Sequence, residues 1–209
     1  MINDQHRRRS IRLQGYDYSQ PGAYFVTIVT RDRECLFGEI VEGAVSLSPY
    51  GAIVQECWAE LPHHFAHVEL DASVAMPNHV HGIIVLMDVG AQHAALLRNP
   101  GHPAPQFAPP QLRVAVGSVG TMVRSFKSVV TKRINEIRGT PGAALWQRNY
   151  YEHVVRDEDE LDHIRRYILD NPVQWALDRE NPEAASVVGA QHAAPLRDEI
   201  SVIFGGVRP

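Results

Sequence analysis

One stretch constrains the fold more than any other: a Pro-Asn turn that leads into a run of apolar, largely β-branched residues between Met76 and Met87. This pattern predicts a buried strand. Because alternate side chains of a strand point to opposite faces, His79 and His81 share one face and Val80 points to the other. Their backbones would lie about 6–7 Å apart, which lets two imidazoles converge on one ion. Taken alone, such a pair is more often structural than metal-binding.

Strand-forming residues recur in several other segments. Each is rich in β-branched or aromatic residues, and turn-forming residues separate one segment from the next. This pattern predicts a first strand over residues 23–30, a β-hairpin over 35–47, a strand over 65–75 and an aromatic strand over 145–155.

Three segments show the spacing of amphipathic helices. Each begins near a residue that can cap a helix, and proline or glycine marks each end. The first begins at Ser48-Pro49 and stops at Pro62, the second spans residues 118–138, and the third runs from Asp157 to Asn171. The apolar stripe expected for the second helix consists of Met122, Phe126, Val129, Val130, Ile134 and Ile137.

The resulting order is strand, helix, strand, strand, helix, strand and a terminal helix. This order is typical of the ferredoxin-like split βαβ arrangement, an α+β fold whose antiparallel sheet carries helices on one face. The terminal helix is then an addition to that unit. We expect one domain over residues 23–175, a basic arm over residues 1–22 and a tail over residues 176–209.

Residues 89–117 interrupt this domain with a stretch that is rich in Gly, Pro and Ala and has no periodicity. Its first seven residues, Val89 to Ala95, recur identically as Val188 to Ala194. Two copies are too few for a repeat fold. We therefore expect a duplicated insertion that is tolerated in two surface loops, and its histidines are poor ligand candidates.

The chain of 209 residues has a formal net charge of −4, so its charge as a whole does not indicate a nucleic-acid partner. Residues 113–138, however, contain six arginines and lysines and one glutamate. Such segregation permits a basic binding surface, although a solvated helix face gives the same pattern. Two unpatterned cysteines suit a reducing cytoplasm, no signal peptide is expected, and no apolar run is long enough to span a membrane.

The terminal helix supplies groups that could face the histidines. His163, Tyr167 and Asn171 recur every four residues and so share one helical face. A tyrosine, an amide and two strand histidines are the parts of a phosphoryl-transfer site with a covalent tyrosine intermediate. The histidines and an amide or carboxylate oxygen would hold a divalent ion that offsets charge on a scissile phosphate. His163 by itself is more typical of an exposed helix residue.

Three motifs in this order make the interpretation specific: MPNHVHG from Met76, LWQRNYYEHVVR from Leu145 and RRYILDNP from Arg165. Over roughly residues 20–175 the chain resembles the single-tyrosine HUH transposases, and more narrowly the REP-associated tyrosine transposases.

The resemblance implies an enzyme that cuts and rejoins single-stranded DNA near hairpin palindromes, through a 5′-phosphotyrosine intermediate and a free 3′-OH. It assigns His79 and His81 to the metal pair, Tyr167 to the nucleophile and Asn171 to the third metal ligand. The implied cofactor is Mg²⁺ or Mn²⁺, and the ligand types also admit zinc. The implied protein is cytoplasmic and nucleoid-associated, has no membrane partner, and is a monomer or a homodimer.

Basic and aromatic residues are the candidates for DNA contact. Trp146, Tyr150 and Tyr151 could stack on unpaired bases, and packing in the core explains these aromatics equally well. The basic helix could follow a phosphate backbone, and the N-terminal arm could enter a hairpin groove. The expected phosphate contacts are Arg7, Arg8, Arg9, Arg124, Lys127, Lys132, Arg133 and Arg148.

Two other functions fit the same fold. A non-catalytic module could bind DNA or RNA hairpins and leave the chemistry unused. A metal-dependent phosphodiesterase could use His79 and His81 to activate water, without a covalent intermediate. The set of His79, His81, Tyr167 and Asn171 favours the strand transferase, because a module that only binds nucleic acid needs none of these residues.

Overall fold

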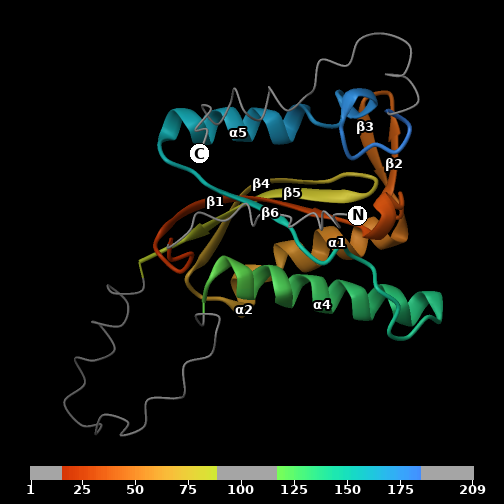
Figure 1. Ribbon diagram of the computed structural model, residues 1–209, viewed down its shortest axis with the longest axis horizontal. Coiled ribbons are helices and arrows are strands. Elements are labelled where there is room, and N and C mark those ends of the chain that lie inside the picture. The colour runs from red at the N-terminus through yellow and green to blue at the C-terminus, as the bar shows by residue number, and fades with distance from the viewer. Residues whose placement is uncertain (1–15, 89–116, 185–209) are drawn as a thin grey trace, which may run out of the picture.

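The computed structural model describes residues 16–88 and 117–184. Its centre is a four-stranded sheet in the order β4-β5-β1-β6, in which all neighbouring strands are antiparallel. The helices between the strands complete the split βαβ arrangement, so the predicted fold class is confirmed (Figure 1). The strands of the sheet are β1 (Gly22–Val29), β4 (Val68–Ala75), β5 (His79–Leu86) and β6 (Tyr151–Val154).

Helices cover both faces of this sheet. In Figure 1, α1 and α4 lie on one side and α5 lies on the other. Residues of β1 alternate between the sides: Val26 and Ile28 join the core with α1 and α4, whereas Phe25 packs with residues of α5. The terminal helix therefore packs on the face of the sheet opposite α1 and α4. The helices are α1 (Pro49–Ala59), α4 (Val119–Arg138) and α5 (Glu158–Asp170).

Local signals fix the ends of these helices as the sequence predicts. At the start of α1, Oγ of Ser48 accepts the backbone N–H of Gly51 at 3.2 Å. At the start of α5, Oδ1 of Asp157 accepts the backbone N–H of Glu160 at 2.8 Å. Helix α4 ends at Gly139, whose φ of 64° lies in the left-handed region that glycine adopts without a steric cost.

Two predicted boundaries are wrong. Pro62 does not end the first helix but sits in the first turn of a separate short helix, α2 (Leu61–His64), where its missing N–H costs no hydrogen bond. The aromatic strand is shorter than residues 145–155, since regular pairing with β1 is confined to β6 and Trp146 forms only an isolated bridge with Thr30.

The apolar stripe predicted for α4 is too wide. Met122, Phe126 and Val130 are buried. Val129 and Ile137, however, are 42% and 60% exposed, because they lie at the edges of the stripe and face away from the sheet.

Smaller elements flank the sheet. The predicted β-hairpin is present and forms a sheet of its own. Residues 1–15 of the N-terminal arm, residues 89–116 and the tail beyond residue 184 lie outside the described residues. Within the described part, none of the helices has the length and apolar character needed to cross a membrane. The smaller elements are β2 (Gly38–Val41), β3 (Ala44–Leu47), η1 (Arg31–Arg33) and η2 (Trp175–Leu177).

Gly82 follows the two histidines in β5 at a point where a larger residue has no room. A Cβ atom there would lie 2.2 Å from Cζ2 of Trp58 in α1. We expect Gly82→Ala to lower the free energy of unfolding by roughly 2 kcal/mol, as measured by urea denaturation, because the indole must move. Adding Trp58→Phe should restore part of the loss, since the smaller ring frees this space. Fully additive losses in the double variant would contradict the assigned cause.

Candidate functional site

The two histidines of β5 lie on the α5 side of the sheet. Their Cα partners on β1 are Val29 for His79 and Thr27 for His81. Both side chains are buried, with 0% and 3% of the residue exposed. Their Nε2 atoms lie 3.0 Å apart. Two ligand atoms at about 2.1 Å from one ion and at right angles are about 3 Å apart, so this separation suits two ligands of one cation.

Asn78 determines which nitrogen of His79 carries the proton. Nδ2 of Asn78 donates to the backbone carbonyls of Arg33 and Glu180, at 3.0 and 2.7 Å. Its Oδ1 atom, which can only accept, therefore faces Nδ1 of His79 at 2.9 Å, and that nitrogen must donate. The lone pair of His79 is therefore on Nε2 and faces Nε2 of His81, as in histidines whose orientation is fixed for metal binding.

His81 is held by two residues of β1. Its Nδ1 lies 2.9 Å from Oγ1 of Thr27, and its ring stacks on Phe25 with centroids 5.5 Å apart. Burial lowers the pKa of both histidines, and the neighbouring His79 lowers the pKa of His81 further. Both imidazoles are therefore neutral near pH 7, which is the state in which they bind metal ions.

A carboxylate that the sequence did not single out joins this group. Oδ2 of Asp178, just after η2, lies 3.8 Å from Nε2 of His79. Oδ1 of the same side chain accepts the backbone N–H of Glu180 at 2.6 Å, which fixes the other oxygen toward the histidines. Ligand atoms of His79, His81 and Asp178 all lie within 4.8 Å of one another. These two imidazoles and one carboxylate could bind a divalent metal ion.

Asn171, the predicted third ligand, is the C-cap of α5 and is buried. Its side chain interacts with both His79 and Tyr167. Its Oδ1 atom has no hydrogen-bond partner among the residues that the structure describes. A buried amide oxygen without a partner is costly, and a cation would satisfy it. The donor set therefore fits a divalent ion, with Asp178 added to the three predicted residues.

Tyr167 projects from α5 onto the histidines. Its Oη atom is 3.4 Å from Nε2 of His81, and its ring meets Phe25 edge-on, with an angle of 85° between the planes. Burial raises the pKa of this phenol, and the negative charge of Asp178 raises it further. A phenol with a raised pKa is a weak nucleophile until positive charge lies beside it. His163, on the preceding turn, is exposed.

Three basic side chains of α4 that were predicted to contact DNA already have protein partners. Nζ of Lys127 donates to the backbone carbonyl of Gln147 at 2.6 Å, and burial lowers the pKa of Lys127 to about 8. Arg133 pairs with a carboxylate of α1 at 2.7 Å. Lys132 lies 4.0 Å from the carboxylate of Glu136, one turn along the helix.

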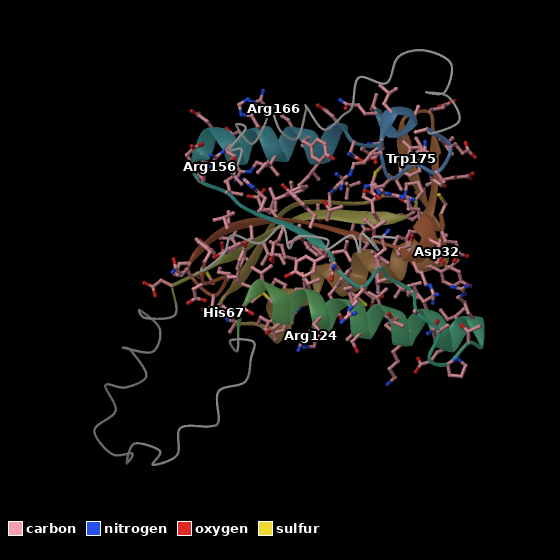
Figure 2. All side chains as sticks on the ribbon, in the orientation of Figure 1. Asp32, His67, Arg124, Arg156, Arg166 and Trp175 are labelled. Carbon is pink, nitrogen blue, oxygen red and sulfur yellow. The ribbon has the colours of Figure 1, made fainter. Side chains whose placement is uncertain are left out.

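Arg124 and Arg148 are different. Both are exposed, and neither guanidinium group forms a hydrogen bond or ion pair with any residue in the described part of the chain. Arg124 lies on α4, on the side of the sheet away from α5 (Figure 2). The other predicted DNA contacts, Arg7, Arg8 and Arg9, lie outside the described residues.

The aromatic residues near Arg148 serve mainly the core. Trp146 packs with Phe37 and Phe126, at centroid distances of 5.2 and 5.8 Å, and is buried. It is therefore not available to stack on a DNA base. Tyr151 is half-buried and packs edge-on against Phe25 at 6.1 Å. Of the two roles that the sequence left open for Trp146, packing in the core is the one observed.

Comparison with known proteins finds a relative by sequence and similar folds among solved structures. No protein-family model matches the sequence. An uncharacterised protein of Haemophilus influenzae is 39% identical over 178 residues, which are 83% of this chain and 93% of the relative. The chain belongs to the same family as this protein.

Two of the similar structures are described as transposases. One is a REP-associated tyrosine transposase bound to a REP hairpin, with a TM-score of 0.49 and 19% identity over 78% of this chain and 73% of that chain. The other is a candidate transposase of Deinococcus radiodurans, with a TM-score of 0.40 and 16% identity over 76% of this chain and 95% of that chain.

A bidentate ion pair holds α5 over β4. Nη2 and Nε of Arg165 bind the carboxylate of Asp71, at 2.6 and 3.0 Å. This contact lowers the pKa of Asp71 below its usual 3.8. The stability that it adds is therefore present above the pH at which a free carboxyl titrates, and is lost as the pH falls through the lowered pKa.

We expect Asp71→Asn to lower the urea midpoint at pH 7, and the difference from the parent protein to shrink below about pH 4. Asp162→Asn is the matched control, because Asp162 also contacts Arg165 but its side chain is 56% exposed. Its effect should be smaller at pH 7. An Asp71→Asn effect that is equal at both pH values would contradict the assigned role.

Proposed function

We propose that this chain is a DNA strand transferase that cleaves and rejoins single-stranded DNA through a covalent phosphotyrosine. The observation that supports this most directly is the 3.4 Å separation between Oη of Tyr167 and Nε2 of His81. A module that only binds DNA needs no half-buried phenol beside a group of metal-ligand atoms. The order of the three sequence motifs supports the same function.

In the proposed reaction, Oη of Tyr167 attacks the phosphorus of a scissile phosphodiester and its proton passes to solvent. The bond between phosphorus and the 3′ oxygen breaks, and that oxygen takes up a proton and leaves as a free 3′-OH. The phosphate stays on the tyrosine as a 5′-phosphotyrosine ester. A 3′-OH can later attack this ester, which restores the DNA and frees the phenol without a nucleotide cofactor.

The group around Tyr167 would bind Mg²⁺ or Mn²⁺, and its ligand types also admit zinc. When bound, the ion would supply positive charge to the phosphate and phenolate oxygens. The protein prepares this site through Asn78, which turns the Nε2 lone pair of His79 inward, and through Phe25, which packs against the rings. The proposed ligands are His79, His81, Asn171 and Asp178.

We propose a DNA hairpin with a single-stranded flank as the substrate. The resemblance of the motifs to REP-associated transposases suggests this class. The guanidinium groups of Arg124 and Arg148 support it, because both are exposed and have no partner in residues 16–88 and 117–184, and phosphate contacts supply most of the affinity for nucleic acid.

The first test is covalent capture. Incubation of the protein with labelled hairpin DNA and Mn²⁺ should give an adduct that survives denaturation, and Tyr167→Phe should abolish it because the attacking oxygen is gone. Strand cleavage with no adduct would indicate water as the nucleophile and would exclude the covalent mechanism.

Tyr151→Phe is the matched control for this experiment. Tyr151 is a half-buried tyrosine on the same side of the sheet, and burial raises its pKa to about 12. It packs against the same Phe25. Its removal should leave the adduct intact. An adduct that persists in Tyr167→Phe and disappears in Tyr151→Phe would assign the nucleophile to the other tyrosine.

The second test is metal affinity. Asp178→Asn keeps the shape of the side chain but removes its charge, and we expect it to weaken Mn²⁺ binding by roughly 10- to 100-fold, measured by titration calorimetry. Asp170→Asn, on the exposed last residue of α5, is the control and should bind as the parent does. Equal affinity in the parent and Asp178→Asn would remove Asp178 from the ligand set.

A further inference from the structure

The edge of the sheet next to β1 contains a bulge. Thr27 pairs with Tyr151, and Thr30 pairs with Trp146, so two more residues lie on the outer side than on β1. The extra residues fall between Gln147 and Tyr150. Bulges of this kind turn side chains out of the plane of a sheet and occur often beside active sites.

Lys127 fastens this bulge to α4. Its Nζ donates to the backbone carbonyls of three consecutive residues: Gln147 at 2.6 Å, Asn149 at 3.3 Å and Arg148 at 3.4 Å. An ammonium group has three N–H donors, so these contacts occupy all of them. The backbone carbonyl of Lys127 also accepts from Nε1 of Trp146 at 3.2 Å. One residue of α4 is thus bound to the bulge through both side chain and backbone.

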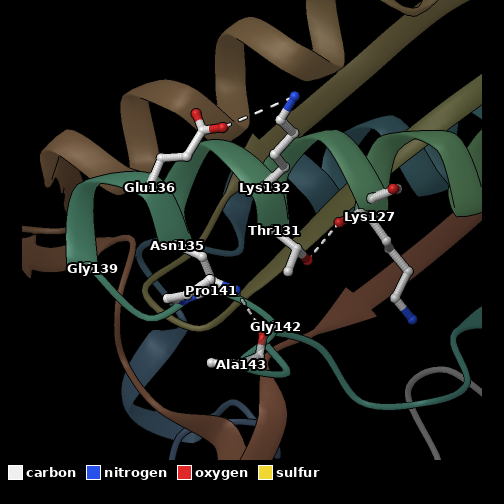
Figure 3. Close-up of a pocket in the computed structure, with 10 residues that line it drawn as sticks. Lys127, Thr131, Lys132, Asn135, Glu136, Gly139, Pro141, Gly142 and Ala143 are labelled. Carbon is white, nitrogen blue, oxygen red and sulfur yellow. Dashed lines mark hydrogen bonds and ion pairs between the residues drawn. The ribbon is translucent and has the colours of Figure 1, made fainter.

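The bulge presents Arg148 to solvent. Its guanidinium has no partner among the described residues, whereas Arg133 and Arg165 each bind carboxylates. The two lysines of α4, Lys127 and Lys132, point to different sides of the helix (Figure 3). Among the described residues, the guanidinium of Arg148 is therefore available to bind phosphate, whereas the ammonium of Lys127 is occupied by backbone carbonyls.

The backbone of the bulge lies near the metal-ligand group in the plan of the sheet. The backbone N–H of Gln147 donates to the carbonyl of Val29 at 2.9 Å, and Val29 is the Cα partner of His79. Gln147 and His79 therefore flank β1 on opposite sides, about 10 Å apart at the usual spacing of strands. A strand of DNA that reached the histidines across this edge of the sheet would pass the bulge that contains Arg148.

We propose that Arg148 binds a backbone phosphate beside the scissile position, and that Lys127 is a positioning residue that acts through the bulge without touching DNA. The inference rests on the proposed function and deepens it. The place of Lys127 in a basic helix suggests that it contacts phosphate directly. In this proposal Lys127 instead holds the backbone that carries Arg148, and Arg148 contacts the phosphate.

The test is a double-mutant cycle on DNA affinity. Binding of a fluorescent DNA hairpin with a single-stranded flank is measured in the Tyr167→Phe background, where no cleavage is expected. Lys127→Met and Arg148→Gln should each weaken binding by roughly five- to tenfold, and each should make the salt dependence shallower by about one phosphate contact. The double variant should bind no more weakly than Arg148→Gln alone, because both changes remove the same contact.

Lys132→Met is the matched control. The sequence has two lysines, both in α4, and Lys132 lies in the exposed part of that helix. Its effect, of whatever size, should add to that of Arg148→Gln. If Lys127→Met does not fold, as judged by circular dichroism, Lys127→Gln replaces it in the same cycle, since its shorter side chain and two N–H donors cannot serve all three carbonyls.

The outcomes separate this inference from the proposed function. Additive effects of Lys127 and Arg148 would place Lys127 on the DNA and overturn the positioning role. Undiminished binding by Arg148→Gln, with firm binding by the parent, would overturn the inference alone. A parent protein that binds no hairpin DNA would overturn both.

Discussion

The antiparallel register of β1 and β5 decides which side of the sheet carries the histidines. Thr27 lies opposite His81, so both imidazoles point toward α5, and Val80 between them enters the core with α1 and α4. A slip of one residue would reverse these side chains and bury the imidazoles among apolar residues. Gly82 opposes such a slip, because only glycine fits above the Trp58 ring. The chemistry of the site therefore depends on a strand pairing that packing holds in place.

Burial then gives the site a surplus of hydrogen-bond acceptors. The Nε2 lone pair of His79, Oδ2 of Asp178 and Oδ1 of Asn171 are all withdrawn from solvent. Few hydrogen-bond donors face these three acceptors. Burial keeps the imidazoles neutral, and the Oη–H of Tyr167 can donate to only one acceptor. An interior with this imbalance is costly unless a positive charge enters it. The same imbalance explains why a cation is a better occupant than a neutral ligand.

Local patterns in the sequence predict much of this arrangement. Alternation in a strand puts His79 and His81 on one face, and helical spacing brings Tyr167 and Asn171 together, so two short-range rules assemble four side chains. Local patterns do not predict the role of Asp178, because it follows the helix in a segment without periodicity. Only the folded chain brings Asp178 close to His79. The short length of β6 is not predicted for a related reason: the bulge before it is held by Lys127, which is distant in sequence, and the local pattern does not indicate this contact.

The segment after η2 serves the site twice. Asp178 points a carboxylate at His79, and two residues on, the backbone carbonyl of Glu180 holds the amide of Asn78 that sets the tautomer of His79. The Glu180 side chain also binds Arg33 at 2.8 Å, which ties the segment to η1. Undocking this segment would therefore remove a ligand and disorient another in one step. Binding of a cation by these residues would therefore be thermodynamically linked to docking of the segment, and each would stabilise the other by the same free energy.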